Sequence, residues 1–253
     1  MVKAKKTLGQ NFLTETTVIN QIIKSIHPLS HDNFLEIGPG RGAITKPLLK
    51  LIKNLHAVEI DKDLLQDLQK LESSNLSIHN QSILSFNPEE YFDKKIRIIG
   101  NLPYNISTQI MLWSFENLEN FEDMHFMFQK EFGERLLSKK DKKSFGRISV
   151  LTQYLTKAEY CFDISPESFS PEPKVKSVFI KFIPIKNRNF HNPITQKLQE
   201  VTRIAFMHKR KMIGKSLKTL MKEEDLANLN IDLKARPENL SVEDYVKISE
   251  TLL

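Results

Sequence analysis

The residues best suited to do chemistry stand together in one short stretch, Gly100-Asn101-Leu102-Pro103-Tyr104-Asn105. The Asn101 amide carries an oxygen that accepts hydrogen bonds. Pro103 biases Leu102 toward an extended conformation, which can turn the Leu102 carbonyl outward as a second acceptor. Tyr104 contributes a flat ring. Two acceptors beside a flat ring suit a planar base that carries an amino group, although a proline turn with a buried tyrosine would show the same pattern.

The predicted elements on either side place this stretch where ligands bind. Residues 96–99 form an apolar run that predicts a buried strand, and residues 106–115 have the pattern of a helix. We therefore expect a strand-to-helix loop at the carboxyl end of a strand, which is where open α/β sheets bind their ligands.

A second candidate binding loop is Glu36-Ile37-Gly38-Pro39-Gly40-Arg41-Gly42, between a predicted strand over 33–37 and a predicted helix over 43–53. Glycine permits positive φ angles and close approach of the backbone, so three alternating glycines predict a ligand cradle. Glu59 follows near the end of a predicted strand over 55–61. An acid there can accept hydrogen bonds from both hydroxyls of a ribose, although Glu59 alone would be taken for a surface acid.

Three kinds of nucleotide ligand compete for this loop. A P-loop is excluded because no Gly-Lys-Ser/Thr follows the glycines. The NAD-binding fingerprint is Gly-x-Gly-x-x-Gly, whereas Gly38-x-Gly40-x-Gly42 is one residue shorter. S-adenosylmethionine has a ribose for Glu59 and a charged amino-acid part that needs close backbone contact, so it is the favoured cofactor. No metal is expected, and the single cysteine, Cys161, excludes a Cys-based zinc site and is expected in the core.

The order of predicted elements indicates an α/β fold. From residue 33 to about residue 137 strands alternate with helices, which predicts a parallel sheet with helices on both faces. Two further strands, over 159–164 and 177–183, have no helix between them and predict an antiparallel addition to the sheet edge. A linker and then a long helix over 195–222 follow, with short helices to the end. We expect a catalytic domain over 1–184 and a small helical domain over 185–253.

The charge of the chain favours an anionic partner. The net charge is +6 and the sequence pI is about 9.2. The excess is local: residues 186–218 carry nine Lys and Arg against Glu200, and residues 135–147 carry six against Asp141. Nucleic acid fits better than a membrane, because no lipid-seeking amphipathic helix accompanies the charge and no apolar run approaches the roughly 18–20 residues that span a bilayer. Solvated helix faces would explain several of these cations individually.

Taken together, the motifs resemble those of the small-subunit (16S) ribosomal RNA adenine dimethyltransferases of the KsgA type. Five motifs stand in the order typical of that family: Gly9-Gln10-Asn11-Phe12-Leu13, the glycine loop at 36–42, Val58-Glu59-Ile60-Asp61, Asn101-Leu102-Pro103-Tyr104, and Phe169-Ser170-Pro171-Glu172-Pro173-Lys174-Val175-Lys176-Ser177-Val178. The likeness covers the full chain. It implies a class I S-adenosylmethionine-dependent methyltransferase with a Rossmann-like sheet and a small all-helical C-terminal domain that binds rRNA.

The resemblance also implies the reaction and its residues. Methyl groups would go to the N6 amino groups of two adjacent adenines in a 3′-terminal hairpin loop of small-subunit rRNA, with a role in subunit biogenesis. The cofactor-binding positions carried over are Asn11, Leu13, Gly38, Gly40, Glu59, Ser82 and Asn101. Ser82 departs from the family pattern, which usually has an acid there to hold the amino group of the cofactor's adenine.

The expected roles in catalysis and RNA binding complete the hypothesis. Asn101 and Leu102 would accept the two N–H bonds of the target amino group, with Pro103 shaping the loop. Tyr104 would stack on one face of the base and Phe169 on the other. The candidate RNA-binding residues are Arg147, Lys209, Arg210 and Lys211.

Two other functions stay open. A large-subunit rRNA adenine methyltransferase of the antibiotic-resistance type shares the catalytic motifs, and a ribosome-assembly factor could act mainly by binding. A DNA adenine methyltransferase is less favoured because no additional target-recognition domain is evident. The expected partner is small-subunit rRNA or the small-subunit precursor, with no membrane partner, and the protein is expected to be a cytoplasmic monomer.

Overall fold

The computed structural model describes residues 4–71 and 73–253. Contacts within the chain divide it into two compact units: Met1–Gly133 with Glu159–Ile183, and Glu134–Ala158 with Pro184–Leu253. The domain boundary that the sequence predicts, at residue 184, would put residues 134–158 in the first unit. In the structure these residues belong to the second unit, because the helix that they contain packs against helices near the C-terminus.

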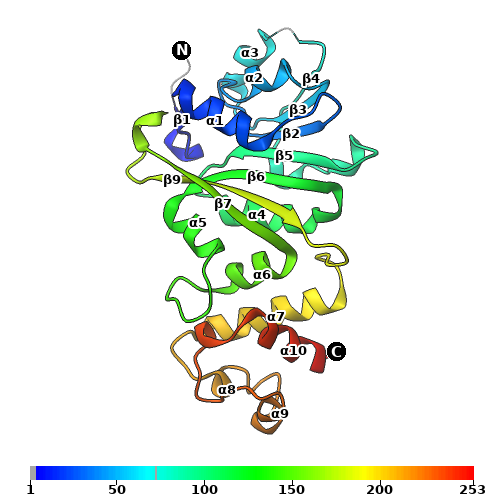
Figure 1. The fold of residues 1–253 in the computed structure, drawn as a ribbon, viewed down its shortest axis with the longest axis vertical. Coiled ribbons are helices and arrows are strands. Elements are labelled where there is room, and N and C mark those ends of the chain that lie inside the picture. The colour runs from blue at the N-terminus through cyan, green and yellow to red at the C-terminus, as the bar shows by residue number, and fades with distance from the viewer. Residues whose placement is uncertain (1–3, 72) are drawn as a thin grey trace. The chain divides into compact units, whose positions relative to one another are not determined.

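A seven-stranded sheet forms the centre of the first unit, in the order β4-β3-β2-β5-β6-β9-β7 (Figure 1). Its strands are β2 (Asn33–Ile37), β3 (Asn54–Val58), β4 (Leu76–His79), β5 (Ile96–Asn101), β6 (Phe121–Gln129), β7 (Thr156–Ile164) and β9 (Ser177–Pro184). The pairings from β4 to β6 are parallel, and β9 runs antiparallel to β6. The predicted parallel sheet with an antiparallel addition at one edge is therefore confirmed.

The helices associated with this sheet cover apolar residues that its strands present. They are α1 (Thr16–Ile26), α2 (Thr45–Leu49), α3 (Lys62–Gln69), α4 (Ser107–Glu116) and α5 (Lys130–Leu136). Ile22 and Ile26 of α1 are buried in one cluster with Phe34 of β2 and Ile99 of β5. Burying such side chains is the main favourable contribution to folding.

One predicted helix is shorter than expected. The sequence predicts a helix over 43–53, whereas α2 covers only Thr45–Leu49. Pro47 has no N–H to donate to the carbonyl four residues earlier, so a regular helix cannot begin at residue 43. The residues after Leu49 form turns instead, with the N–H of Leu51 donating to the Leu48 carbonyl over 2.8 Å.

A short ribbon outside the main sheet was not predicted from the sequence. Strand β1 (Phe12–Leu13) pairs antiparallel with β8 (Phe169–Ser170), and Leu13 lies opposite Phe169. The pairing joins the N-terminal segment to a loop more than 150 residues later in the chain. Two of the family motifs thus meet in space.

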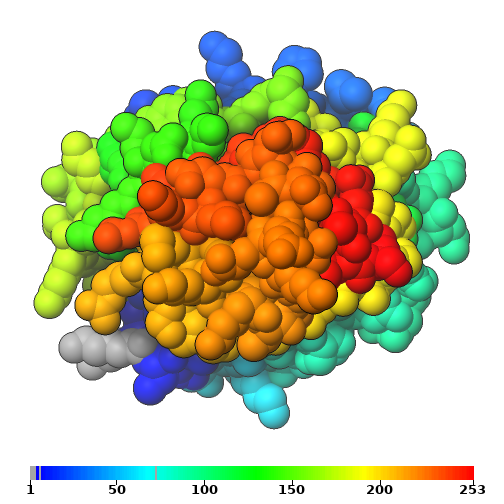
Figure 2. Space-filling view, turned by 90° about the horizontal axis from the view of Figure 1, so that it is seen from below, coloured from blue at the N-terminus to red at the C-terminus, as the bar shows by residue number. Residues whose placement is uncertain are grey.

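The second unit is mainly helical. It contains α6 (Arg147–Leu155), α7 (Pro193–Met207), α8 (Ile213–Ser216), α9 (Glu223–Asn228) and α10 (Val242–Thr251), and Figure 2 shows its C-terminal segments in orange to red. The predicted single helix over 195–222 is wrong. It is interrupted after Met207, because the Lys209 ammonium donates to backbone carbonyls at 143 and 145, and the N–H of Ile213 donates to Ala235 over 2.7 Å.

Cys161 is half-buried and packs against the hydrophobic cluster of the first unit, as expected of a core residue. Within the described residues, no helix combines the length and the apolar character needed to cross a membrane.

Candidate active site

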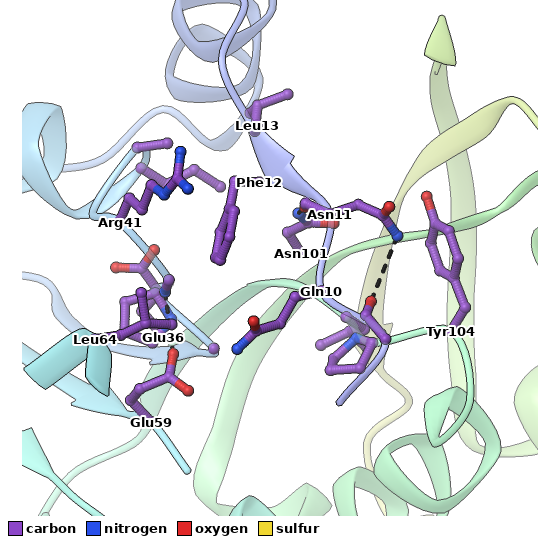
Figure 3. Close-up of a pocket in the computed structure, with 18 residues that line it drawn as sticks. Gln10, Asn11, Phe12, Leu13, Glu36, Arg41, Glu59, Leu64, Asn101 and Tyr104 are labelled. Carbon is purple, nitrogen blue, oxygen red and sulfur yellow. Dashed lines mark hydrogen bonds between the residues drawn. The ribbon is translucent and has the colours of Figure 1, made fainter. Parts of the chain in front are cut away.

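Three neighbouring parallel strands bring the predicted motifs to one edge of the sheet. Ile37 at the end of β2 lies opposite Val58 of β3 on one side and Gly100 of β5 on the other. The carboxyl ends of parallel strands share an edge, so the segments that follow them are adjacent there. A pocket at this edge is lined from all three strand ends and from the N-terminal segment (Figure 3).

The glycine loop forms one wall of this pocket. Gly38, Gly40 and Gly42 have φ angles of 64°, 59° and 77°, in the left-handed region that glycine tolerates best. A Cβ atom on Gly40 would also lie only 3.0 Å from a ring carbon of Phe12. The predicted cradle therefore needs glycine at residue 40 for both its conformation and its space.

Glu59 closes the loop at the end of the pocket opposite Tyr104 (Figure 3). One carboxylate oxygen accepts from the Gly40 N–H over 3.1 Å, and the other accepts from the Asp61 N–H over 2.9 Å. Burial raises the pKa of Glu59, although these backbone hydrogen bonds oppose the shift. A carboxylate oxygen has more than one acceptor site, so a ligand hydroxyl can still be bound.

The N-terminal segment lies along the pocket and is tied to the end of β3. Lys5 donates to one oxygen of Asp61 over 2.5 Å, and Gln10 donates to the other over 2.8 Å. Asp61 is almost fully buried, and its side chain also accepts from the Asp63 N–H at the start of α3. Residues 9–13 contribute five consecutive positions to the pocket lining.

The side-chain amide of Asn101 is held in one orientation by a hydrogen bond. It is the last residue of β5, where it pairs with Met127 of β6, and not a loop residue as the sequence predicts. Its Nδ2 donates to the Asn11 carbonyl over 2.8 Å. Because the amide nitrogen is engaged there, the amide oxygen is left as the acceptor on the other side of the group.

Leu102, Pro103 and Tyr104 also line the pocket. The Leu102 N–H donates to the Met127 carbonyl over 3.2 Å, which continues the pairing of β5 with β6. The Tyr104 hydroxyl bonds the Ser177 hydroxyl over 2.7 Å, and burial raises its pKa. That contact fixes the orientation of the tyrosine ring at the pocket.

The other predicted site residues of the first unit lie in different surroundings. Asn11 and Leu13 line the pocket with the glycine loop, whereas Phe169 is buried in the hydrophobic cluster opposite Leu13 and does not belong to the pocket lining. Ser82 lines an adjoining pocket that shares Gln10, Gly38, Glu59 and Pro103 with the first. The Ser82 hydroxyl accepts from the Leu84 N–H over 3.3 Å.

The predicted RNA-binding residues belong to the second unit and differ in their contacts. Lys209 is engaged by two backbone carbonyls, and Arg210 and Lys211 are exposed. Arg147 is partly buried at the start of α6, and burial together with the charge of Arg203 lowers its pKa. A half-buried cation beside a second cation favours the approach of an anion.

Several lining residues were not singled out from the sequence, namely Gln10, Phe12, Glu36, Arg41 and Leu64. The Arg41 guanidinium lies 4.4 Å from the centre of the Phe12 ring. Glu36 is almost fully buried, and its carboxylate accepts from the Thr45 hydroxyl over 2.7 Å. For Gln10, Phe12, Glu36 and Arg41 the available signal was their position within the family motifs, whereas Leu64 lies outside those motifs.

A family model described as ribosomal RNA adenine dimethylase matches residues 1–253. The chain belongs to this dimethylase family. The dimethylase is 40% identical over 250 residues to the ribosomal RNA small subunit methyltransferase A of Dechloromonas aromatica, covering 98% of both chains. It is 42% identical over 249 residues to the protein of that name from Buchnera aphidicola, covering 97% of this chain and 95% of the other. It is therefore an enzyme of the methyltransferase class.

Solved structures share the fold of this dimethylase. A crystal structure of a dimethyladenosine transferase from Plasmodium falciparum has a TM-score of 0.78 at 25% identity, covering 94% of this chain and 95% of the other. The 23S rRNA methyltransferase ErmE has a TM-score of 0.75 at 22% identity, covering 96% and 99%. The predicted class I methyltransferase fold is confirmed.

Proposed function

We propose that this dimethylase transfers methyl groups from S-adenosylmethionine to the N6 amino groups of two adjacent adenines in a 3′-terminal hairpin loop of small-subunit rRNA. The observation that carries the proposal is the Asn101 amide, held at the end of β5 by the Asn11 carbonyl and lining the pocket with Tyr104. The names of the full-length relatives support the small subunit as the substrate. Methylation of this RNA would make the enzyme part of small-subunit biogenesis.

The pocket residues fit the proposed cofactor. Glu59 stands at a strand end, where its carboxylate can accept hydrogen bonds from ribose hydroxyls. Gly38 and Gly40, in the loop that Glu59 contacts, carry no side chains themselves, so the backbone can approach a charged amino-acid group closely. Asn11, Leu13 and Ser82 would complete the contacts from the N-terminal segment and the adjoining pocket. When bound, S-adenosylmethionine supplies an activated methyl group.

The residues at and just after the end of β5 would prepare the adenine amino group. Its nitrogen is a poor nucleophile because its lone pair is delocalised into the ring. The Asn101 amide oxygen and the Leu102 carbonyl would each accept a hydrogen bond from one of its two N–H groups. These hydrogen bonds favour a pyramidal nitrogen whose lone pair points at the methyl group. Tyr104 would stack on the base, a contact worth about 1–3 kcal/mol. The protein thus contributes position and electrostatics to the reaction.

The basic residues of the second unit would bind the RNA backbone. Arg210 and Lys211 are exposed and suited to phosphates, whereas Lys209 would act by holding residues 143 and 145 in place. The target adenines are accessible because unpaired loop bases can be turned into a pocket. Phe169 would support the site through its pairing with Leu13 and not as a stacking surface.

The substrate is tested by transfer of labelled methyl groups to unmodified small subunits, with large subunits and naked rRNA alongside. We expect label on small subunits, mapped to two adjacent dimethylated adenines near the 3′ end. Label confined to large subunits would overturn the substrate assignment. Subunit binding without any label would point to an assembly factor.

The catalytic role of Asn101 is tested by Asn101→Ala. Losing one positioned hydrogen-bond partner of the reacting group should lower single-turnover methyl transfer by about 10²–10³-fold. Binding to small subunits should change less than twofold. Asn120→Ala, which precedes β6 at the opposite edge of the sheet, is the control and should keep its rate. A near-normal rate for Asn101→Ala would contradict the mechanism.

A further inference from the structure

A second large cavity lies within the helical unit and has no part in the site described above. It is formed by the loop 138–146, by α6, by the segment before α7 and by the start of α10. Its free volume is about 560 Å³. That is large enough for a nucleotide-sized group, since pockets for small ligands typically span roughly 300–1,000 Å³.

The floor of this cavity is apolar and partly aromatic. The rings of Phe145 and Tyr154 line it but are only 1% and 7% exposed, so Val242 and Val246 of α10 contribute the partly exposed apolar surface. The flat face of any nucleobase packs well on an apolar surface, so this contact does not depend on the RNA sequence. The floor therefore suits an unstacked base.

The rim of the cavity carries strong positive charge. Lys139, Lys140, Arg188 and Lys247 line it, against Glu243 as an acidic lining residue. No ion pair between these three lysines and a carboxylate is found in the described part of the chain. These ammonium groups are thus not held by a carboxylate at ion-pair distance, which leaves them available for phosphate.

The arginine of the rim is held in a fixed position. The Arg188 guanidinium carbon lies 4.7 Å from the centre of the Tyr154 ring, and Nη1 donates to the Tyr154 carbonyl over 2.8 Å. This hydrogen bond uses one of the five N–H donors of a guanidinium. A planar cation fixed beside an aromatic floor is well suited to a phosphodiester next to a stacked base.

The loop that carries Lys139 and Lys140 is also held in place. Gln153 donates to the Ser138 carbonyl over 2.7 Å, and the Asp141 N–H donates to the Glu238 carbonyl over 2.8 Å. Asn239 donates to the Asp141 carboxylate over 2.9 Å, which engages the acid of this loop away from the lysines. Less ordering entropy is lost on binding when a loop is already fixed.

We propose that this cavity binds one unstacked nucleotide of the rRNA substrate, with the base on the apolar floor and the flanking phosphates on the lysine and arginine rim. The inference rests on the proposed function, which supplies RNA as the substrate. It adds an anchoring site outside the catalytic pocket. A nucleotide bound here would hold the RNA through the second unit while the target adenine occupies the first.

Two variants test the charge and the floor separately. Lys140→Glu/Lys247→Glu reverses two rim charges, and Lys222→Glu/Lys234→Glu makes the same change at exposed residues of the same unit outside the cavity. Val246→Trp fills the floor without changing charge. Binding is measured against a transcript of the 3′ domain of small-subunit rRNA and against unmodified small subunits, over a range of salt concentrations.

We expect the rim variant to bind the transcript at least about tenfold more weakly than its control. Its salt slope should be smaller by about 0.7–0.9 for each lost phosphate contact. Val246→Trp should bind at least about fivefold more weakly with an unchanged slope. Circular dichroism and cofactor binding should match the parent protein for every variant, because the cofactor pocket lies in the other unit.

Three outcomes would overturn the proposal. Equal losses for the rim variant and its control would mean that the charge acts diffusely. Parent-like binding by Val246→Trp, with its fold intact, would mean that no base enters the cavity. A loss confined to small subunits, with normal transcript binding, would identify a protein occupant. These readouts require no methyl transfer, so a failure of the proposed function would appear separately in the labelling experiment.

Discussion

The Glu36 carboxyl is almost fully buried in the wall of the pocket proposed to bind the cofactor. Burial, together with the nearby charge of Glu59, raises its pKa to about 7, although the hydrogen bond from Thr45 opposes the shift. A carboxyl with this pKa changes charge near neutral pH. Whether it is ionised should therefore matter to a charged ligand in the pocket.

We expect the affinity for S-adenosylmethionine to rise with pH between about 6 and 8. The cofactor carries a sulfonium and an ammonium against one carboxylate, so its net positive charge favours the ionised form of Glu36. Calorimetric titration at several pH values measures the effect. Glu36→Gln keeps an acceptor for Thr45 but cannot ionise, and it should remove most of the pH dependence. An unchanged pH profile in that variant would assign the effect to another group.

Ser82→Asp should tighten cofactor binding about fivefold, because a carboxylate accepts an N–H bond more strongly than a hydroxyl does. Ser82 lines the adjoining pocket, and its hydroxyl accepts from the Leu84 N–H, a capping role that aspartate performs equally well. Calorimetry with the parent and variant proteins checks the change, and labelled methyl transfer should persist. Unchanged or weaker binding would mean that Ser82 does not face the cofactor.

At the scale of single residues, the site residues that lie within local motifs could be predicted from the sequence. Gly38, Gly40 and Glu59 follow from strand ends and glycine conformation, which depend on nearby sequence. The raised pKa of Glu36 and the burial of Phe169 were not predictable, because both depend on packing between segments far apart in the chain.

Among the elements, the N-terminal segment is held to the site partly through Asp61. Burial works to raise the pKa of Asp61, but the hydrogen bonds from Lys5 and Gln10 outweigh it and leave the pKa below its ordinary value. The carboxylate therefore remains charged at neutral pH and keeps residues 5–10 beside the pocket.

Asp61→Asn should loosen this segment and weaken cofactor binding about fivefold. Asparagine still caps α3, so the fold should persist, but the ion pair with Lys5 is lost. Hydrogen exchange should become faster over residues 8–13, and calorimetry should show the lower affinity. Asp67→Asn, whose ion pair with Lys70 lies elsewhere on α3, is the matched control. Unchanged exchange in Asp61→Asn would show that other contacts hold the segment.

Elements with strong local patterns were predictable: β2 has the predicted bounds, and α4 is shifted by one residue from the predicted 106–115. The break between α7 and α8 was not predictable, because Lys209 and Ile213 find their partners in other segments. The pairing of β1 with β8 was not predictable either, because two-residue strands carry no periodic signal.

At the scale of the whole molecule, the buried His125 and the partly buried His56 oppose folding in acid. Burial lowers the pKa of His125 to about 4, and burial together with the neighbouring His79 lowers that of His56 to about 4. An unfolded chain takes up these protons near pH 6.5. The stability that the neutral rings contribute is complete above that pH and is lost as the pH falls toward 4.

His125→Leu should make the free energy of unfolding less dependent on pH between about 6.5 and 4. The slope of the unfolding free energy against pH should fall by the equivalent of up to one bound proton, because leucine takes up no proton on unfolding. Urea denaturation at several pH values measures the slope. His208→Gln, at an exposed residue of the other unit, is the control and should follow the parent protein. An equal slope in His125→Leu would contradict the low pKa of His125.

The ribbon between β1 and β8 also constrains how a newly made chain reaches activity. Translation delivers Phe12 long before Phe169, and the two strands cannot pair until the later one has left the ribosome. Before that moment residues 9–13 lack one of their supports, although the glycine loop and Asn101 have already been synthesised. Cofactor added to a nascent chain that ends before β8 should therefore stabilise it less than it stabilises a chain extending beyond residue 170.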